Sequence, residues 1–116
     1  YYTVLVEPKL RVVSLNTNIV VSGTMFSVLN NPDMGGQLAW LEDVLAQSEA
    51  LGQKVWIIGH ATSKYGWISP QVERFLSLCT RYKDTVAGQF FGHIHTDQFN
   101  VISDVNTSEP IGVAYS

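Results

Sequence analysis

The chain has three histidines, and two of them, His93 and His95, lie either side of one isoleucine in AGQFFGHIHTDQF, residues 87–99. If this stretch is extended, the two imidazoles share one face, because alternate side chains of a strand point the same way. Two imidazoles on one face are a pair of ligands for zinc and other first-row metals, which bring the pKa of bound water towards neutrality. The spacing therefore indicates a hydrolytic metal centre.

The third histidine, His60, follows a glycine just as His93 does, and both Gly-His pairs end an apolar run. KVWIIGH, residues 54–60, reads as a short, fully buried strand, and TVAGQFFGH, residues 85–93, reads as another strand. The ends of neighbouring strands in open α/β sheets converge on the crevice where ligands bind. We therefore expect all three histidines to meet at one edge of the sheet.

The residues next to the histidines leave several interpretations open. Gly59 and Gly92 would let the backbone turn sharply before each histidine and let a metal or phosphate approach closely. Asp97 would hold one imidazole in the tautomer that binds a metal, or would cap its own turn. His-X-His also occurs in strands that bind no metal, and a lone histidine at a strand end is commonly a hydrogen-bonded residue. If the three histidines close on a single ion, water takes the fourth position.

Further elements must hold these strand ends in place. In chain order they are a strand over Leu10–Thr17, a long loop over 18–36, a helix over Gln37–Leu51, the strand to His60, a helix from Ser69, the strand to His93, and an antiparallel pair over Gln98–Ile102 and Ile111–Tyr115. Gly52 closes the first helix, and the second has Ser69 as its N-cap and Pro70 in its first turn. This alternation argues for an α/β fold with a mixed, partly parallel sheet.

Composition and charge narrow the classes of function. Hydrophobic residues make up 46% of the 116 residues and charged residues 15%, as in a globular domain. The net charge of −3 gives no electrostatic reason to expect a nucleic-acid-binding patch, and no apolar stretch is long enough for a transmembrane segment. Cys79, alone among apolar neighbours, reads as a buried structural thiol. The sequon at Asn106 points towards a secreted glycoprotein.

Three stretches follow one another along the chain: LRVVSLNTN, GGQLAWLEDVLAQSEALGQKVWIIGH and AGQFFGHIHTDQF. Together they resemble the C-terminal half of the calcineurin-like metallophosphoesterases, in the acid sphingomyelinase and acid-sphingomyelinase-like phosphodiesterase branch. The resemblance extends from about Tyr2 to Tyr115. It implies part of a two-sheet β-sandwich flanked by helices, with metal ligands on loops at strand ends, in a secreted or lysosomal protein.

The resemblance also implies a two-metal centre, usually of zinc, that activates a water to attack a phosphodiester of a phospholipid or nucleotide. Carried over residue by residue, His60 and His93 would bind one metal and His95 the other. The family's first half supplies an Asp-X-His motif, a Gly-Asp motif whose aspartate bridges the metals, and a Gly-Asn-His motif with a further ligand and the general acid. None of these motifs occurs in the chain, so no catalytic residue is identified.

We therefore expect residues 1–116 to be the C-terminal half of a metallophosphoesterase domain, with little or no activity alone. Half of a two-sheet β-sandwich would leave an apolar face of its sheet uncovered. We expect the missing half-domain or a self-associating partner to cover this face. After His60 the chain runs ATSKYGWISP where the branch usually has a Pro-Pro-Gly-like loop, which leaves the substrate open. Two alternatives remain: a truncated, non-catalytic module that binds one zinc, and a phosphomonoesterase of the same superfamily.

Overall fold

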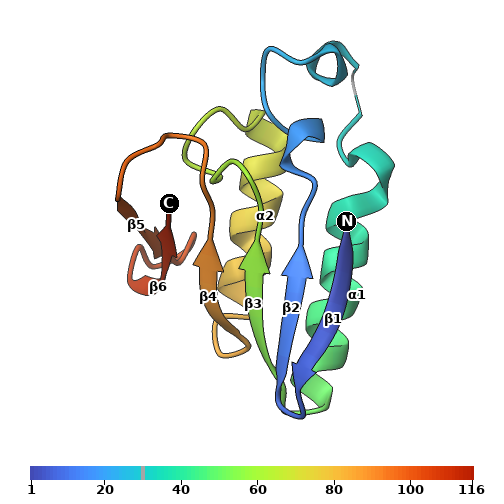
Figure 1. Ribbon diagram of the computed structural model, residues 1–116, viewed down its shortest axis with the longest axis vertical. Helices are drawn as coiled ribbons and strands as arrows, with labels where there is room; N and C mark the ends of the chain where they lie inside the picture. The colour runs from blue at the N-terminus through green and yellow to red at the C-terminus, as the bar shows by residue number, and fades with distance from the viewer. Residues whose placement is uncertain (30) are drawn as a thin grey trace.

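Residues 1–29 and 31–116, which the computed structural model describes, form one mixed six-stranded sheet with two α-helices (Figure 1). The strands are β1 Tyr2–Glu7, β2 Leu10–Ser14, β3 Lys54–Ile58, β4 Val86–Phe90, β5 Phe99–Ser103 and β6 Pro110–Tyr115. The helices are α1 Gln37–Ala50 and α2 Ser69–Arg81, and the 3-10 turns Thr17–Ile19, Met25–Val28 and Met34–Gly36 lie between β2 and α1. The strand order is β1-β2-β3-β4-β6-β5; β2, β3, β4 and β6 are parallel, and β1 and β5 are antiparallel to their neighbours. The predicted mixed α/β fold is confirmed.

The predicted strands and helices are present and differ from the predictions mainly at their ends. The predicted elements begin at Leu10, yet Tyr2–Glu7 forms β1, which pairs with β2 in the register Val4↔Val12. The N-cap of α2 is Ile68 rather than Ser69, whose hydroxyl instead donates a hydrogen bond to the Glu73 carboxylate at 2.6 Å. The second sheet of a sandwich does not occur among the described residues, so it stays an expectation about the rest of the domain.

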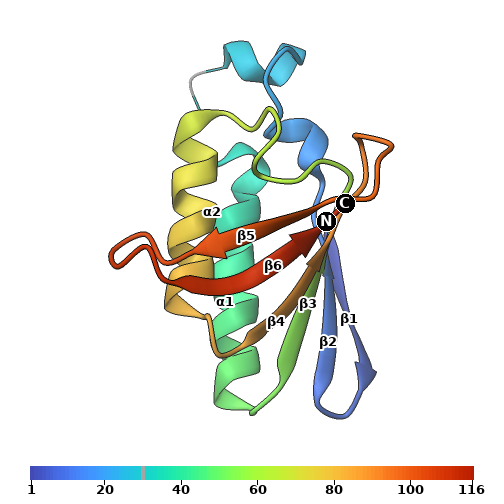
Figure 2. The same cartoon turned by 90° about the vertical axis from the view of Figure 1, so that its left-hand side faces the viewer.

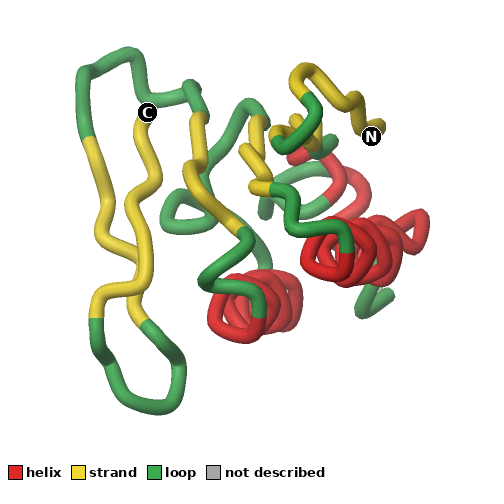
Figure 3. Tube along the Cα trace, turned by 90° about the horizontal axis from the view of Figure 1, so that it is seen from below, coloured by secondary structure: helices red, strands yellow, loops and turns green. Residues whose placement is uncertain are grey.

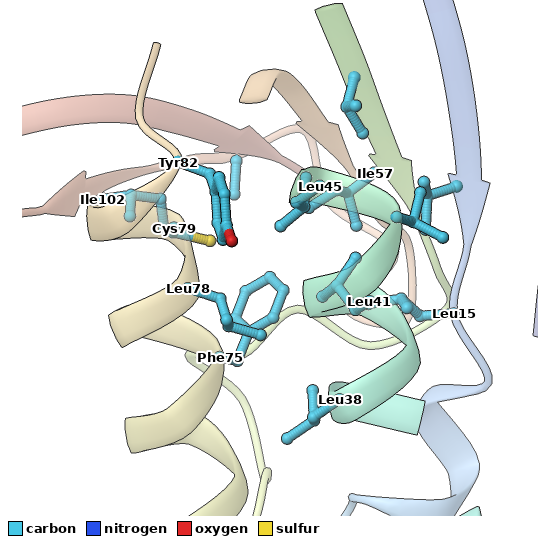
Figure 4. Close-up of a cluster of buried hydrophobic side chains, with 14 of the residues drawn as sticks. Leu15, Leu38, Leu41, Leu45, Ile57, Phe75, Leu78, Cys79, Tyr82 and Ile102 are labelled. Atoms are coloured by element: carbon cyan, nitrogen blue, oxygen red, sulfur yellow. The ribbon is translucent and has the colours of Figure 1, made fainter. Parts of the chain in front are cut away.

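The core lies between the sheet and the two helices, which cover the same face of the sheet (Figure 3). Val13, Val55 and Ile57 of β2 and β3 are completely buried, as are Leu41 of α1 and Phe75 of α2. Figure 4 shows the side chains of both helices meeting in this layer. Full burial of such a side chain contributes about 1.5–3 kcal/mol, so this layer is what holds the helices on the sheet. In the described part of the chain, no helix is both long and apolar enough to cross a membrane.

The opposite face of the sheet is open and apolar. The prediction that β3 is fully buried is wrong: Val55 and Ile57 face the helices, whereas Trp56 between them is 40% exposed. The physical reason is that both helices lie on one face. Trp56 packs edge to face against Phe90, with ring centroids 5.4 Å apart, and Phe90 stacks on Tyr115 at 5.7 Å. An aromatic row therefore crosses the uncovered face.

The junction between β4 and β6 is short. It is paired only at Gln89↔Ala114 and Phe90↔Tyr115, whereas β2 and β3 pair along the whole of both strands. A cavity of about 80 Å³ lies where the two strands diverge, with Cys79 of α2 in its wall. The Oε1 atom of Gln89 is buried and has no partner among the described residues. The β5–β6 hairpin is thus joined to the rest of the sheet over a short seam.

Cys79 is buried on the inner side of α2, as predicted for a structural thiol. Burial raises the pKa of its thiol to about 12, although the side-chain amide of Gln89, 3.5 Å from Sγ, opposes this rise. The thiol is therefore protonated and unreactive at neutral pH.

Asp33 anchors the long loop between β2 and α1. Its Oδ1 accepts a hydrogen bond from the N–H of Leu38 at 2.8 Å, and its Oδ2 accepts one from the N–H of Ala39 at 2.9 Å. These N–H groups lie in the first turn of α1, where helical partners are lacking, so the carboxylate caps the helix. Arg74 of α2 lies 3.2 Å from the same carboxylate. One side chain thus fixes the loop, α1 and α2 relative to each other.

Candidate metal centre

The candidate site lies where the carboxyl ends of β2, β3 and β4 meet. Main-chain hydrogen bonds continue past the strands: the N–H of Gly59 donates to the carbonyl of Phe90 at 3.1 Å, and the N–H of Gly92 donates to the carbonyl of His60 at 2.8 Å. These bonds hold the segments after β3 and β4 side by side. The predicted convergence of strand ends is confirmed for His60 and His93, which become neighbours.

The imidazoles of His60 and His93 meet edge to face, with ring centroids 5.0 Å apart and an interplanar angle of 83°. Nε2 of His60 lies 3.2 Å from Nδ1 of His93. Two nitrogens that bind one tetrahedral zinc ion are about 3.3 Å apart, so this separation fits two ligands of one ion. It equally fits a hydrogen bond between two neutral rings. Both residues are exposed, so an ion can reach them from solvent.

His95 does not join this pair. Residues 91–98 belong to no strand, and φ is 81° at His93 and 55° at His95. The prediction that this stretch is extended is wrong, and the argument that its two imidazoles share a face fails with it. The reason is the path of the chain, which must reverse direction between β4 and β5. Among residues 1–29 and 31–116, no three His, Cys, Asp or Glu side chains gather closely enough to hold an ion, so the three histidines do not close on one point.

The glycines before the histidines do not make the sharp turns that were expected. Gly59 lacks a positive φ, and a Cβ there would lie 2.9 Å from Cγ2 of Thr17 and 3.1 Å from the ring of Phe91. Packing against Thr17 and Phe91 therefore accounts for a glycine at position 59, and close approach of a metal or phosphate there stays a prediction. A Cβ at Gly92 would come no closer than 3.9 Å to the carbonyl oxygen of His60. Left-handed backbone conformations occur instead at His93 and His95, although residues other than glycine rarely adopt them.

Asp97 is exposed, and in the part of the chain that the structure describes no hydrogen bond joins it to a histidine. Its role in orienting an imidazole stays a prediction.

Buried contacts hold the loop after His60, and sequence reasoning did not find them. The N–H of Ala61 donates to Oγ1 of Thr17 at 3.0 Å, and Nε1 of Trp67 donates to the carbonyl of Ala61 at 3.0 Å. Ala61, Thr17 and Trp67 are all buried. Thr17 and Ala61 are 44 positions apart, and no local pattern signals such a contact.

Tyr65 and Gln98 join this loop to the one that carries the other two histidines. The hydroxyl of Tyr65 donates a hydrogen bond to Oε1 of Gln98 at 3.0 Å. Gln98 is itself anchored, because it exchanges two main-chain hydrogen bonds with Ser116, at 2.8 and 2.9 Å. The loops on either side of the histidine pair are thus connected through a side chain as well as through the main chain.

Comparison with known proteins gives the following relatives. No family model matches the chain. Sphingomyelin phosphodiesterase of Bos taurus is 37% identical over 121 residues, which cover 99% of this chain and 18% of that protein. Sphingomyelin phosphodiesterase B of Dictyostelium discoideum is 38% identical over 87% of this chain and 16% of its own length. Cyclic GMP-AMP phosphodiesterase SMPDL3A of Homo sapiens is 37% identical over 84% of this chain and 23% of its own length. The chain thus spans less than a quarter of each of these relatives.

A dimetal phosphatase from Danio rerio has a similar fold. Its crystal structure superposes with a TM-score of 0.69 at 16% sequence identity, over 98% of this chain and 47% of that one. The chain therefore has the fold of about half of that phosphatase.

Proposed function

Because the chain belongs to the acid-sphingomyelinase-like branch of the calcineurin-like metallophosphoesterases, we propose that it forms one side of a metal-dependent phosphodiesterase centre. The observation that carries the proposal is the 3.2 Å separation between Nε2 of His60 and Nδ1 of His93. Phosphodiesterases among the relatives, together with the dimetal fold of the phosphatase, support it.

We propose that His60 and His93 bind one ion and that His95 binds a second ion, with zinc as the metal in both positions. Imidazole is a common ligand of zinc, and the separation of the first two histidines matches the edge of a zinc tetrahedron. Bound metal of this kind supplies a water that ionises near neutral pH and positive charge for the phosphate oxygens. The contribution of this chain is to hold its imidazoles at strand ends, where the contacts of Thr17 and Gln98 restrain both loops.

The rest of the centre is proposed to come from another part of the domain, with residues 1–116 as its C-terminal half. The open sheet face supports this, because Trp56, Phe90 and Tyr115 expose an aromatic row that a second layer would cover. A self-associating copy is the alternative cover for this face. Two ligands of one ion do not complete a two-metal site, so we propose that the chain alone has little or no activity.

We propose a phosphodiester of a phospholipid or of a nucleotide as the substrate. The names of the relatives include both kinds, since one group acts on sphingomyelin and another on cyclic GMP-AMP. A secreted or lysosomal location is proposed on the same ground. Asn106 is exposed on the β5–β6 turn and begins the sequon Asn106-Thr107-Ser108, so a glycan there is part of the proposal. Glycosidase treatment of the secreted chain should reduce its mass, and Asn106→Gln should abolish the change.

A chimera provides the test of activity. Residues 1–116 would replace the matching segment of the Bos taurus relative, so that the remaining motifs are supplied by that protein. We expect bis(p-nitrophenyl) phosphate to be hydrolysed by the zinc-loaded chimera, but not by the 116 residues alone or by a chimera with His93→Ala. A folded, zinc-loaded chimera without turnover would contradict the proposed function, and robust turnover by the chain alone would contradict the half-site. Faster hydrolysis of p-nitrophenyl phosphate would identify a phosphomonoesterase instead.

Metal analysis of the chimera tests the number of ions. Two zinc ions per molecule are expected. One ion, lost with His60→Ala, together with no turnover would instead indicate a non-catalytic module that binds a single zinc.

A further inference from the structure

Thr17 contacts the chain on both sides of His60. Its Oγ1 accepts a hydrogen bond from the N–H of Ala61 at 3.0 Å, and a Cβ at Gly59 would lie 2.9 Å from its Cγ2. Thr17 and Ala61 are 2% and 1% exposed, whereas His60 is exposed. Figure 2 shows the turn that begins at Thr17, in blue, beside the loop that follows β3, in green. A buried side chain thus holds the main chain from which an exposed imidazole projects.

The hydroxyl of Thr17 extends the pairing of β2 with β3 beyond the strands. The main-chain bonds between the two reach Ile58, whose carbonyl accepts a hydrogen bond from the N–H of Leu15 at 2.9 Å. On the other flank, the carbonyl of His60 accepts one from the N–H of Gly92, which follows β4. The bond from Ala61 to Thr17 comes from the β2 side. The segment that carries His60 is therefore held from both flanks.

Gln37, the first residue of α1, holds the main chain next to Thr17. Its Oε1 accepts a hydrogen bond from the N–H of Asn16 at 2.7 Å, and its Nε2 donates to the carbonyl of Asn16 at 3.4 Å. Gln37 is completely buried, and a buried amide is costly unless its polar atoms are paired. Its two contacts fix the peptide groups on both sides of Asn16. They connect α1 through Thr17 to the segment that carries His60.

We propose that Thr17 is a positioning residue for His60 in the metal centre, and that Gln37 positions Thr17. The inference rests on the proposed function for its metal, but not for its geometry. A ligand that is already held in place needs less ordering when the ion binds, so the affinity rises. Without the Thr17 hydroxyl, the buried N–H of Ala61 has no acceptor, and the main chain shifts to reach one. His60 then loses its place 3.2 Å from His93, measured from Nε2 to Nδ1.

Two substitutions of Thr17 separate its hydroxyl from its shape. Thr17→Val removes the hydroxyl and keeps the volume, whereas Thr17→Ser keeps the hydroxyl. The first measurement is NMR of the metal-free chain: the NOE between the ring protons of His60 and His93, and hydrogen exchange of the Ala61 amide. In Thr17→Val we expect the NOE to disappear and the amide to exchange at least about fivefold faster. In Thr17→Ser we expect the NOE to remain and the exchange rate to stay within about twofold.

The second measurement is the zinc affinity of the chimera that carries the same substitutions, by competition with a coloured chelator. We expect the affinity to fall by at least about fivefold for Thr17→Val and to stay within about twofold for Thr17→Ser. If the unsubstituted chimera binds no zinc, the proposed function fails, while the NOE in the metal-free chain still decides the role of Thr17.

Gln37→Met tests the connection to α1, because it keeps the side-chain volume and removes both contacts with Asn16. We expect the NOE to weaken and the zinc affinity to fall by about two- to fivefold. Ser48→Ala is the matched control. Ser48 is also a completely buried polar residue of α1, and its Oγ has no partner among the described residues. Both measurements should therefore match those of the unchanged protein.

Several results would overturn the proposal. If Thr17→Val keeps the NOE and the zinc affinity, the hydroxyl does not position His60. If Thr17→Ser loses them as Thr17→Val does, the methyl group and not the hydroxyl is responsible. Equal losses in Gln37→Met and Ser48→Ala would remove the role assigned to Gln37. If Thr17→Val does not fold, Gln37→Met decides, and an unchanged NOE in that variant would overturn the proposal.

Discussion

The hydroxyl group of Tyr65 donates a hydrogen bond to Oε1 of Gln98 at 3.0 Å, across 33 positions of the sequence. Tyr65 lies in the loop that follows His60, and Gln98 ends the loop that carries His93. The bond therefore holds together the two loops on which the candidate ligands lie, outside the main-chain pairing of the sheet.

Tyr65→Phe removes this hydroxyl and keeps the ring. A hydrogen bond of this kind contributes about 0.5–1.5 kcal/mol, so we expect zinc affinity to fall by about 2–10-fold if the bond positions the ligand loops. Isothermal titration calorimetry measures the affinity. Tyr1→Phe is the matched control, because the Tyr1 hydroxyl bonds to the carbonyl of Gly35 at 2.6 Å, away from the site. Equal zinc affinity of both variants would show that the contact does not position the ligands.

Replacement of each histidine by alanine distinguishes the proposed ions. His60→Ala and His93→Ala each remove a proposed zinc ligand. Loss of a residue that only hydrogen-bonds to a ligand weakens metal binding by roughly 10–100-fold, so we expect each of these variants to weaken binding to the first zinc site by more than that. His95→Ala should leave that site within about twofold. Competition with a coloured chelator measures these affinities. If His95→Ala weakens the first site as much as the other two, His95 binds the same ion.

Gly59→Ala should destabilise the fold. The new methyl group would lie 2.9 Å from Cγ2 of Thr17, and overpacking of this kind costs about 1–3 kcal/mol. Urea denaturation gives the change in the free energy of unfolding. Gly92→Ala is the control, since its methyl group meets nothing closer than 3.9 Å and should change stability by less than about 0.5 kcal/mol. Similar losses in both variants would argue against the packing explanation.

Asp33→Ala should remove the cap of α1 and the contact with Arg74. We expect the free energy of unfolding to fall by about 0.5–2 kcal/mol, mainly because two N–H groups of the first turn lose their acceptor. Thermal and urea denaturation provide the measurement. Glu42→Ala, which removes the exposed and longer 3.9 Å contact with Arg74, should have an effect below about 0.5 kcal/mol. A larger loss for Glu42→Ala would assign the stabilisation to the ion pairs instead.

Cys79 should resist alkylation in the folded chain and react on unfolding. Burial raises the pKa of its thiol to about 12, so the thiolate that reacts with iodoacetamide is scarce at pH 8. Mass spectrometry after labelling with and without urea measures the difference. Since the folded pKa lies above the value of about 8.5 for a free thiol, this group's contribution to stability is complete below pH 8.5 and is lost as pH rises towards 12. Rapid labelling without urea would contradict the burial.

The parts of the fold that local patterns encode could be predicted from the sequence. Helical spacing located α1, and the position of Gly-His after an apolar run placed His60 and His93 at neighbouring strand ends. The sequence did not predict β1. Apolar residues occupy both faces of this exposed strand, so it lacks the alternation of apolar and polar residues that indicates a strand.

What escaped prediction depends on distant parts of the chain. The left-handed conformation of His95 follows from the reversal between β4 and β5, which no local pattern reports. The contact of Thr17 with Ala61 joins residues 44 positions apart, and Gly59 is demanded by side chains that approach it only in the folded state.

The short seam between β4 and β6 divides the sheet into regions of unequal resistance to opening. Segments with few main-chain bonds to their surroundings open at lower free energy than the core, as cooperative units. The β5–β6 hairpin pairs with β4 at two positions, followed by one main-chain bond from Phe91 to Tyr115, whereas β2 and β3 pair along their whole length. We therefore expect the hairpin amides to exchange with solvent before those of β2 and β3. His93 and His95 lie on the loop that crosses this boundary, whereas His60 is fixed to the slowly exchanging side.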